Sequence, residues 1–160
     1  MAKKQSKNDL ADNIKKTSIG VLQACLTDSV DLYNATRQAH WNVKGPAFHS
    51  LHLMFETFYD TLADDIDLLA ERIVQLGGTA NGTSQTVTSG TRLPAYPTDL
   101  RAGEAHVTAL IERYGAVGAA LRGGIDTTDE AGDADSADIL TNVSKNIDKA
   151  LWMLEATAEK

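Results

Sequence analysis

The pattern that most restricts what this chain can fold into is a long amphipathic segment from about Ala47 to Leu76. Its apolar residues recur every three or four positions, which is the period of a helix with one core-facing side. Gly77 and Gly78 follow at once, and glycine is common just beyond the C-terminus of a helix. A helix of this length must bury its apolar side against other long elements. The predicted core-facing residues are Leu51, Phe55, Phe58, Leu62, Ile66, Leu69, Ile73 and Leu76.

Other segments of the chain have the same apolar period and predict three more long helices. Gly45 and Pro46 are helix breakers, so they place a short connection between the first helix and the second. The first helix is expected at about Asp9 to His40, the third from an N-cap at Thr98 or Asp99 to Gly123-Gly124, and the fourth from about Ser136 onward.

The connection between the second and third helices is much longer than the other two. Its polar stretch, TANGTSQTVTSGTRLPAYP, is too long for a hairpin between adjacent antiparallel helices, so it should cross the bundle, with room for one short helical turn. Four helices with one long crossover have the ferritin-like connectivity. We therefore predict an all-α fold, a ferritin-like four-helix bundle with a long crossover between helices 2 and 3. Residues 1–160 form a single domain, in which residues 1–8 are a lysine-bearing N-terminal tail.

Four polar residues of the second helix share a stripe that is separate from its apolar side. His52, Glu56, Asp67 and Glu71 fall within about 100° of one another on a helical wheel. His52 and Asp67 are nevertheless separated by about 22 Å along the helix axis. A metal ion holds nitrogen and oxygen ligands at about 2 Å. One copy of this helix therefore cannot bring the four side chains to one ion.

A second copy of the same helix, lying antiparallel across a two-fold axis, can complete the site. If the two copies cross near Tyr59 to Ala63, His52 and Glu56 of one subunit face Asp67 and Glu71 of the partner subunit. An isologous interface makes every such arrangement twice. The spacing therefore predicts two identical sites at a dimer interface.

His40 ends the first helix and is carried to the same place by the short connection that follows. The candidate site becomes His40, His52, Glu56, Asp67 and Glu71, and two imidazoles with three carboxylates suit iron, manganese or zinc. A solvated acidic helix face is the alternative interpretation of the carboxylates. No glutamate is followed three positions later by histidine, so a di-iron centre inside one bundle is not expected. The remaining histidines, His49 and His106, lack comparable partners and are assigned to the surface or the core.

Charge and composition exclude several classes of protein. A net charge of −7 argues against nucleic-acid binding over the whole surface. The single cysteine, Cys25, fits a reducing compartment, and we expect neither secretion nor membrane insertion, hence a cytoplasmic protein. The charge is uneven, because the first eight residues carry Lys3, Lys4 and Lys7 without an acid, whereas Asp126 to Asp138 contains six acids without a base.

A series of motifs extends along nearly the whole chain, from about residue 8 to about residue 158. They are RQAHWNVKGPAF with a following LH, then DLLAERIVQLGG, AYPTD, IERYG, ADILT and DKALWMLEA. In this order and spacing they closely resemble the Dps family of ferritin-like mini-ferritins. The resemblance implies a hollow homo-dodecamer with ferroxidase centres at its two-fold interfaces. It also implies iron as the metal, hydrogen peroxide as the preferred oxidant of Fe(II), a stored ferric oxyhydroxide core and protection of DNA from oxidative damage.

Carried over by motif, the metal ligands of the resemblance are His40, His52, Asp67 and Glu71, the residues that the helical spacing also selects. Glu56 stands where most family members have aspartate. Its longer side chain could still reach a metal ion or bridge two ions.

The resemblance also suggests roles outside the ligand set. Trp41, beside His40, resembles a family tryptophan that could intercept stray oxidising equivalents. The acidic segment is similar to the lining of the three-fold pores of the family, where carboxylates concentrate cations and would steer Fe(II) inward. Asp133, Asp135 and Asp138 are the candidate pore residues, and a solvated acidic loop is the alternative.

Some members of the family bind DNA through a lysine-rich N-terminal tail. Lys3, Lys4 and Lys7 could make such phosphate contacts, although the net charge of −7 would make them weak and sensitive to salt. A DNA-binding, DNA-compacting nucleoid protein with secondary metal binding is therefore an alternative function. A non-catalytic cage that sequesters zinc or manganese through the same ligands is a third.

Overall fold

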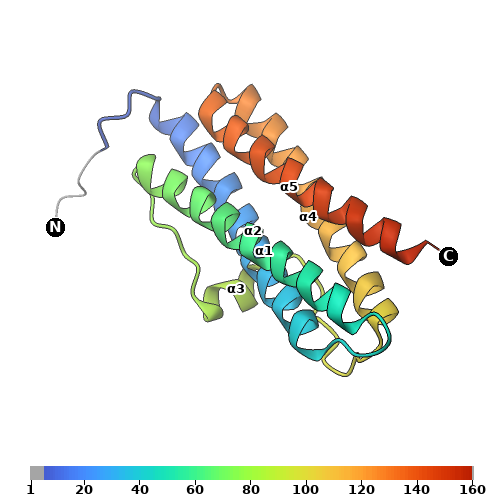
Figure 1. Ribbon diagram of the computed structural model, residues 1–160. Helices are drawn as coiled ribbons and strands as arrows, with labels where there is room; N and C mark the ends of the chain where they lie inside the picture. The colour runs from blue at the N-terminus through green and yellow to red at the C-terminus, as the bar shows by residue number, and fades with distance from the viewer. Residues whose placement is uncertain (1–5, 160) are drawn as a thin grey trace.

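The computed structural model describes residues 6–159, and its regular secondary structure in that part of the chain consists of helices, with one isolated β-bridge between Lys44 and Ala102. The helices are α1 (Asp12–Asn42), α2 (Phe48–Gln75), α3 (Ser84–Gly90), α4 (Gly103–Glu130) and α5 (Ala134–Ala158). Figure 1 shows the four long helices side by side as a bundle, with the short α3 outside it. Within the described residues, no helix is both long enough and apolar enough to cross a membrane.

The order of the helices confirms the predicted connectivity. α1 and α2 run antiparallel through a short connection, and α4 and α5 form a second antiparallel pair (Figure 1). The chain between these pairs, residues 76–102, leads from the end of α2 back to the opposite end of the bundle. It contains α3, which packs against α1. The long crossover with a short helical segment is therefore confirmed.

One apolar side of each long helix faces a shared core. Along α2, every predicted core position is buried apart from Ile66, which is partly buried. Phe55, Leu69 and Ile73 have no exposed surface at all. The apolar period does not show that Asp65 and Arg72 are also buried on this helix, at 1% and 4% exposure. Arg72 forms an ion pair with Asp133, and Asp65 accepts a hydrogen bond from Asn146.

The predicted boundaries of the third helix were wrong at both ends. α4 has its N-cap at Ala102 instead of Thr98 or Asp99, and it continues through Gly123-Gly124 to Glu130. Close packing explains the second error, because Gly124 lies where α4 crosses α1 and α5. A Cβ atom on Gly124 would lie 2.9 Å from Val21 Cγ1 and 3.4 Å from Leu140 Cδ1. The chain turns instead at Gly132, whose φ of +91° is readily adopted only by glycine.

The two adjacent glycines of α4 provide a matched test of this explanation. Gly123→Ala should raise the free energy of unfolding by roughly 0.5–1 kcal/mol, because alanine is the better helix former and the site is open. Gly124→Ala should lower it by about 1–3 kcal/mol, because the added methyl group overpacks the contact with α1. Denaturant unfolding at one protein concentration measures both. Equal effects of the two substitutions would show that packing did not select Gly124.

Polar contacts to the buried residues Asp28 and Arg113 fix the crossover to the bundle. The Arg92 guanidinium forms an ion pair of 2.7 Å with Asp28 of α1, whose other carboxylate oxygen accepts a hydrogen bond from the Arg92 backbone N–H. Further along, Arg113 of α4 donates to the carbonyl oxygens of Pro94 and Ala95. These contacts give a segment with few apolar residues a defined path along the bundle.

His106 joins the same segment to α4 and should make stability depend on pH. It is 1% exposed, and its Nδ1 lies 2.7 Å from the Tyr96 hydroxyl. Burial lowers the pKa of His106 below the ordinary value of 6.5. At pH values between the lowered pKa of folded His106 and the ordinary 6.5, the unfolded chain binds more protons than the folded chain. The free energy of unfolding therefore falls as the pH drops below about 6.5.

We expect His106→Gln to remove part of the loss of stability between pH 7 and pH 5, roughly the range in which an unfolded histidine takes up its proton. His49→Gln is the control, since His49 is exposed at the start of α2. The measurement is the unfolding midpoint as a function of pH at fixed protein concentration. Parallel curves for the three proteins would contradict the role given to His106.

Candidate metal centre

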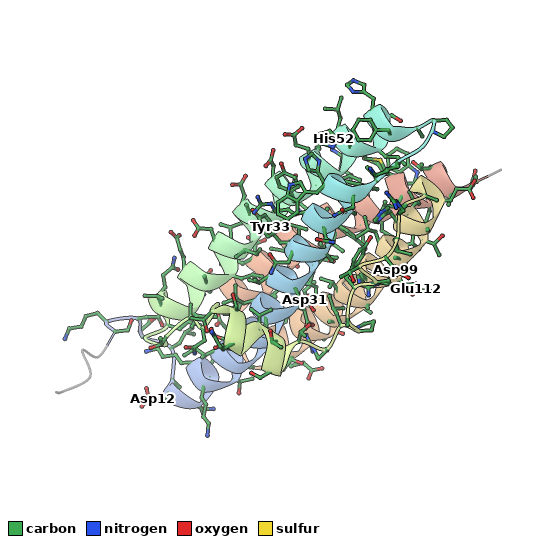
Figure 2. The ribbon with its side chains drawn as sticks, turned by 90° about the horizontal axis from the view of Figure 1, so that it is seen from below. Asp12, Asp31, Tyr33, His52, Asp99 and Glu112 are labelled. Carbon is green, nitrogen blue, oxygen red and sulfur yellow. The ribbon has the colours of Figure 1, made fainter. Side chains whose placement is uncertain are left out.

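His40 and His52 lie together where α1 ends and α2 begins. The connection of residues 43–47 turns the chain back on itself, so the last turn of α1 packs beside the first turns of α2. The two imidazole rings stack with centroids 3.7 Å apart and an angle of 20° between their planes. Figure 2 shows His52 near this end of the bundle. The structure thus confirms that the short connection brings the two histidines into contact.

Two reciprocal hydrogen bonds fix the orientation of both rings. His40 Nδ1 lies 2.8 Å from the carbonyl oxygen of His52, and His52 Nδ1 lies 2.9 Å from the carbonyl oxygen of His40. A carbonyl oxygen only accepts, so each Nδ1 must carry the proton. In the neutral rings, both Nε2 atoms then keep a lone pair for a metal ion. In metal-binding histidines, the ring nitrogen that does not bind the metal commonly donates to a backbone carbonyl, which fixes the ring in place.

Aromatic residues and an arginine surround this pair. Tyr59 stands edge-on to His40, with ring centroids 5.2 Å apart, and Tyr33 stands edge-on to Tyr59 at 5.9 Å. The Arg37 guanidinium lies over the rings of Tyr33, Tyr59 and Trp41 at 5.4, 5.6 and 4.8 Å. Burial, together with the negative charges of Glu56 and Asp60, raises the pKa of Tyr59, so this phenol stays neutral at physiological pH.

Arg37, Tyr33 and Tyr59 were not predicted from the sequence to lie beside the candidate site. One signal was present, because Tyr33, Arg37 and Trp41 are four residues apart and must share one face of α1. Trp41 is 60% exposed and touches Arg37, so it is placed beside the candidate site without being buried in it.

The carboxylates divide into two groups along α2. Glu56 is one helical turn from His52 and is partly buried, whereas Asp67 and Glu71 lie further along the helix and are exposed. Within residues 6–159 of one chain, no three His, Cys, Asp or Glu side chains come close enough together to hold a metal ion. One subunit therefore brings together two histidines and, one turn away, Glu56, but not Asp67 and Glu71.

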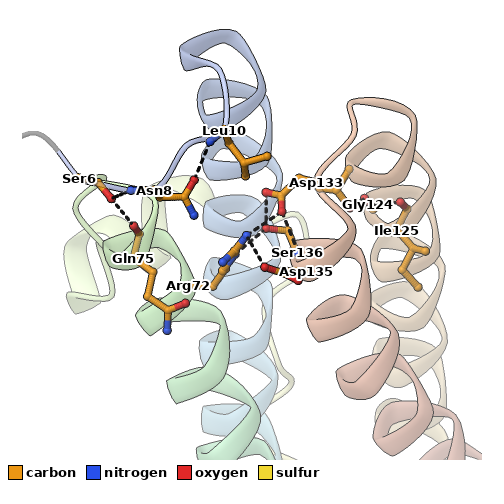
Figure 3. A network of polar contacts seen from close by, with 11 residues as sticks. Ser6, Asn8, Leu10, Arg72, Gln75, Gly124, Ile125, Asp133, Asp135 and Ser136 are labelled. Carbon is orange, nitrogen blue, oxygen red and sulfur yellow. Dashed lines mark hydrogen bonds and ion pairs between the residues drawn. The ribbon is translucent and has the colours of Figure 1, made fainter.

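The candidate pore residues are separated by the structure. Asp133 is 1% exposed and forms the N-cap of α5, accepting from the backbone N–H and the hydroxyl of Ser136. Its carboxylate also forms an ion pair of 2.7 Å with Arg72, and Figure 3 shows this network. The expectation that Asp133 faces a pore needs correction, because both oxygens are used inside the subunit. Asp135 and Asp138 are exposed and remain candidates.

The lysines that could contact DNA fall at the edge of the described chain. Lys3 and Lys4 lie outside the described residues, and Lys7 is exposed. Beside it, the Ser6 hydroxyl donates to the carbonyl oxygen of Gln75 at 3.0 Å (Figure 3). From Ser6 onward, the segment that precedes α1 is therefore attached to the end of α2.

Comparisons with known proteins agree with the fold and the site. The chain matches the ferritin-like domain family over residues 19–160. It is 50% identical over 156 residues to a DNA protection during starvation protein of Agrobacterium fabrum, covering 98% of this chain and 96% of that protein. DpsC from Streptomyces coelicolor superposes with a TM-score of 0.94 at 25% identity, covering 98% of this chain and 92% of that one.

A Dps protein from Bacillus brevis superposes with a TM-score of 0.87 at 30% identity, covering 93% of this chain and 99% of that one. The bundle, the crossover and the matched domain thus define a ferritin-like protein. More narrowly, the chain belongs to the Dps family, as the motifs around His40 and Glu71 predicted.

Proposed function

We propose that this protein is a ferroxidase and iron-storage protein, which oxidises Fe(II) with hydrogen peroxide and stores ferric mineral inside a dodecameric shell. The observation that supports it best is the stacked pair His40 and His52, whose two Nε2 atoms are left free by the hydrogen bonds of Nδ1. Glu56 lies one turn away, and Asp67 and Glu71 continue the same stripe. An antiparallel α2 of a second subunit would bring those two acids to the histidines.

In this proposal iron is the substrate, and the protein supplies placement. His40, His52 and Glu56 bind from one subunit, while Asp67 and Glu71 bind from its partner. Nitrogen and carboxylate ligands together suit Fe(II), and the carboxylates stabilise the additional positive charge of Fe(III). Two Fe(II) ions each give one electron to hydrogen peroxide, its O–O bond breaks, and two protons complete two water molecules. Because both electrons are delivered together, hydroxyl radical is not released.

The aromatic residues beside the ligands have a protective role in the same proposal. Trp41 and Tyr59 lie next to the site and could supply an electron to a stray oxidant before it leaves the protein. The Arg37 guanidinium lies over both rings. It also adds a positive charge close to the anionic ligands.

The proposed function is tested by mixing the protein with Fe(II) under nitrogen and adding hydrogen peroxide. We expect rapid oxidation, followed by ferric absorbance, with the iron retained on a particle of about 206 kDa, twelve times the 17.2 kDa chain. His52→Ala should lower the initial rate to close to that of buffer alone, because loss of even a residue behind a metal ligand costs about 10–100-fold. His49→Ala, three residues earlier and exposed, is the control.

Oxidation at the rate of buffer alone would contradict the proposal. Tight zinc or manganese binding without oxidation would instead favour the sequestration cage.

Asp135 and Asp138 are proposed to attract Fe(II) at the pores, so removing both charges should slow iron entry at low salt more than at high salt.

DNA binding is the second candidate, and it rests on the lysine-bearing start of the chain and the name of the Agrobacterium relative. Lys3, Lys4 and Lys7 would be the contacts. Few phosphate contacts and a net charge of −7 predict retardation of DNA in a gel at low salt only. Absence of retardation even at low salt would exclude this candidate.

A further inference from the structure

A small, partly open cavity lies between α2 and α5, beside the exposed Thr57 and Lys149, on a side of α2 different from the candidate metal centre. Its volume is about 110 Å³, and its lining comes from α2, α4 and α5. A water molecule occupies about 30 Å³ of liquid, so the cavity has room for roughly three waters or one small ion with water. The polar residues of the lining are Thr57, Thr61, Asp65, Tyr114, Asn146 and Lys149.

Asp65 is the residue that makes this cavity unusual. It is 1% exposed, and its Oδ1 accepts a hydrogen bond of 2.8 Å from Asn146 Nδ2. Its Oδ2 is buried and makes no hydrogen bond to any residue of the described chain, and no described basic side chain forms an ion pair with Asp65. Leaving a carboxylate buried without a partner is costly, so something outside the described contacts should satisfy it.

The hydroxyl groups of the lining cannot donate to Asp65, because their protons are used elsewhere. Thr57 and Thr61 donate to the carbonyl oxygens one turn earlier on α2, at 3.1 and 2.9 Å. The Thr36 hydroxyl donates to the Leu32 carbonyl oxygen at 2.8 Å, so it must accept in its contact of 3.2 Å with the Tyr114 hydroxyl. The proton of Tyr114 is therefore directed at Thr36. What these side chains can still offer is lone pairs.

Apart from the exposed Lys149 ammonium, which forms no ion pair with Asp65, and the donating Asn146 amide nitrogen, the polar atoms of the lining side chains are oxygens. Because the Asn146 amide nitrogen donates to Asp65, the amide oxygen of Asn146 remains as a further acceptor. Burial raises the pKa of Asp65 to about 6, so at pH 7.5 the carboxyl group is still charged in most molecules. Water would supply donors but would leave the negative charge uncompensated. A cation provides both attraction to the oxygens and neutralisation.

We propose that this cavity binds a monovalent alkali cation, of about the size of potassium, through the Asp65 carboxylate and the surrounding oxygens. Oxygen ligands select hard cations. A single carboxylate neutralises a single positive charge, whereas a divalent ion would add a second charge that the neighbouring Lys149 ammonium repels. The volume of about 110 Å³ accommodates an ion of the size of potassium together with water. This inference is independent of the iron chemistry proposed for the other side of α2.

The direct test is a crystal of the protein soaked in rubidium chloride at pH 7.5. We expect an anomalous peak at coordination distance from Asp65 Oδ2. In solution, potassium chloride should raise the unfolding midpoint by about 3 °C relative to tetramethylammonium chloride at equal ionic strength, because the organic cation is too large for the cavity. Asp65→Asn should lose both effects, and Asp64→Asn, its exposed neighbour, should keep both.

Two outcomes would overturn the inference. If crystals of the unmodified protein show no rubidium and the unfolding midpoint does not depend on the cation, the cavity holds only water beside a neutral acid. If rubidium enters only in Lys149→Met, the lysine ammonium is the natural occupant. Rubidium seen in crystals of the unmodified protein and absent from those of Asp65→Asn would support the inference, whatever the stability of the variant.

Discussion

Shells assembled from two inactive variants should recover about a quarter of the ferroxidase centres. Asp67→Ala and His52→Ala each remove one ligand from every site of a homo-oligomer, so each variant alone should oxidise Fe(II) at close to the buffer rate. In a mixed dimer, the intact His52 of one chain meets the intact Asp67 of the other at one site, and the second site loses both. Random mixing in equal amounts makes half of the dimers mixed. Since one of the two sites in each mixed dimer is intact, a quarter of all sites are intact.

The measurement is the initial rate of peroxide-dependent oxidation after the two variants are unfolded and refolded together. Mass spectrometry of intact shells verifies that both chains are present. The matched control combines His52→Ala with Glu56→Ala, both from the same half of the site, and should recover no intact site. Mixed shells that stay as inactive as their parents would contradict ligands shared between subunits.

Features that follow from the regular spacing of apolar residues along the chain were predictable from the sequence. Features that depend on contacts between helices were not. α2 was predicted to within one residue at each end, because a strict apolar period stops at Gly77. α4 was predicted to stop too early, because a glycine placed for close helix packing looks the same in sequence as one that ends a helix. Gly124 is of the first kind and Gly132 of the second.

The candidate site shows the same division. The proximity of His40 and His52 was predictable from the short connection between the first two helices. The separation of His52 from Asp67 was predictable from the rise per residue of a helix. The reciprocal hydrogen bonds to the backbone carbonyls depend on how α1 and α2 pack, which no pattern of residue types specifies. Arg37 was missed for a similar reason, since its partners come from two helices.

Asp133 lies in an acidic segment of the sequence but has a structural role. Removing the charge of Asp133 should have a large effect on the free energy of unfolding. Asp133→Asn keeps a side chain that can cap α5 but removes the charge that pairs with buried Arg72. Arg72 would then keep only the 81% exposed Asp135 carboxylate, 3.7 Å away, which compensates a buried charge weakly, so we expect a loss of about 3–5 kcal/mol. Denaturant unfolding at fixed protein concentration and pH 7 measures it.

The exposed pair Arg122 and Asp148 provides the control, because its atoms are 2.9 Å apart but both side chains are about half exposed. Asp148→Asn should cost no more than about 1 kcal/mol. Burial by itself raises the pKa of Asp133, but the hydrogen bonds from Ser136 and Arg72 outweigh it and hold that pKa below the ordinary 3.8. The stabilisation is therefore complete above pH 3.8 and lost as the pH falls through the folded pKa. Equal losses at the two aspartates, or a loss at Asp133 that persists at lower pH, would show that the buried charge pair is not the cause.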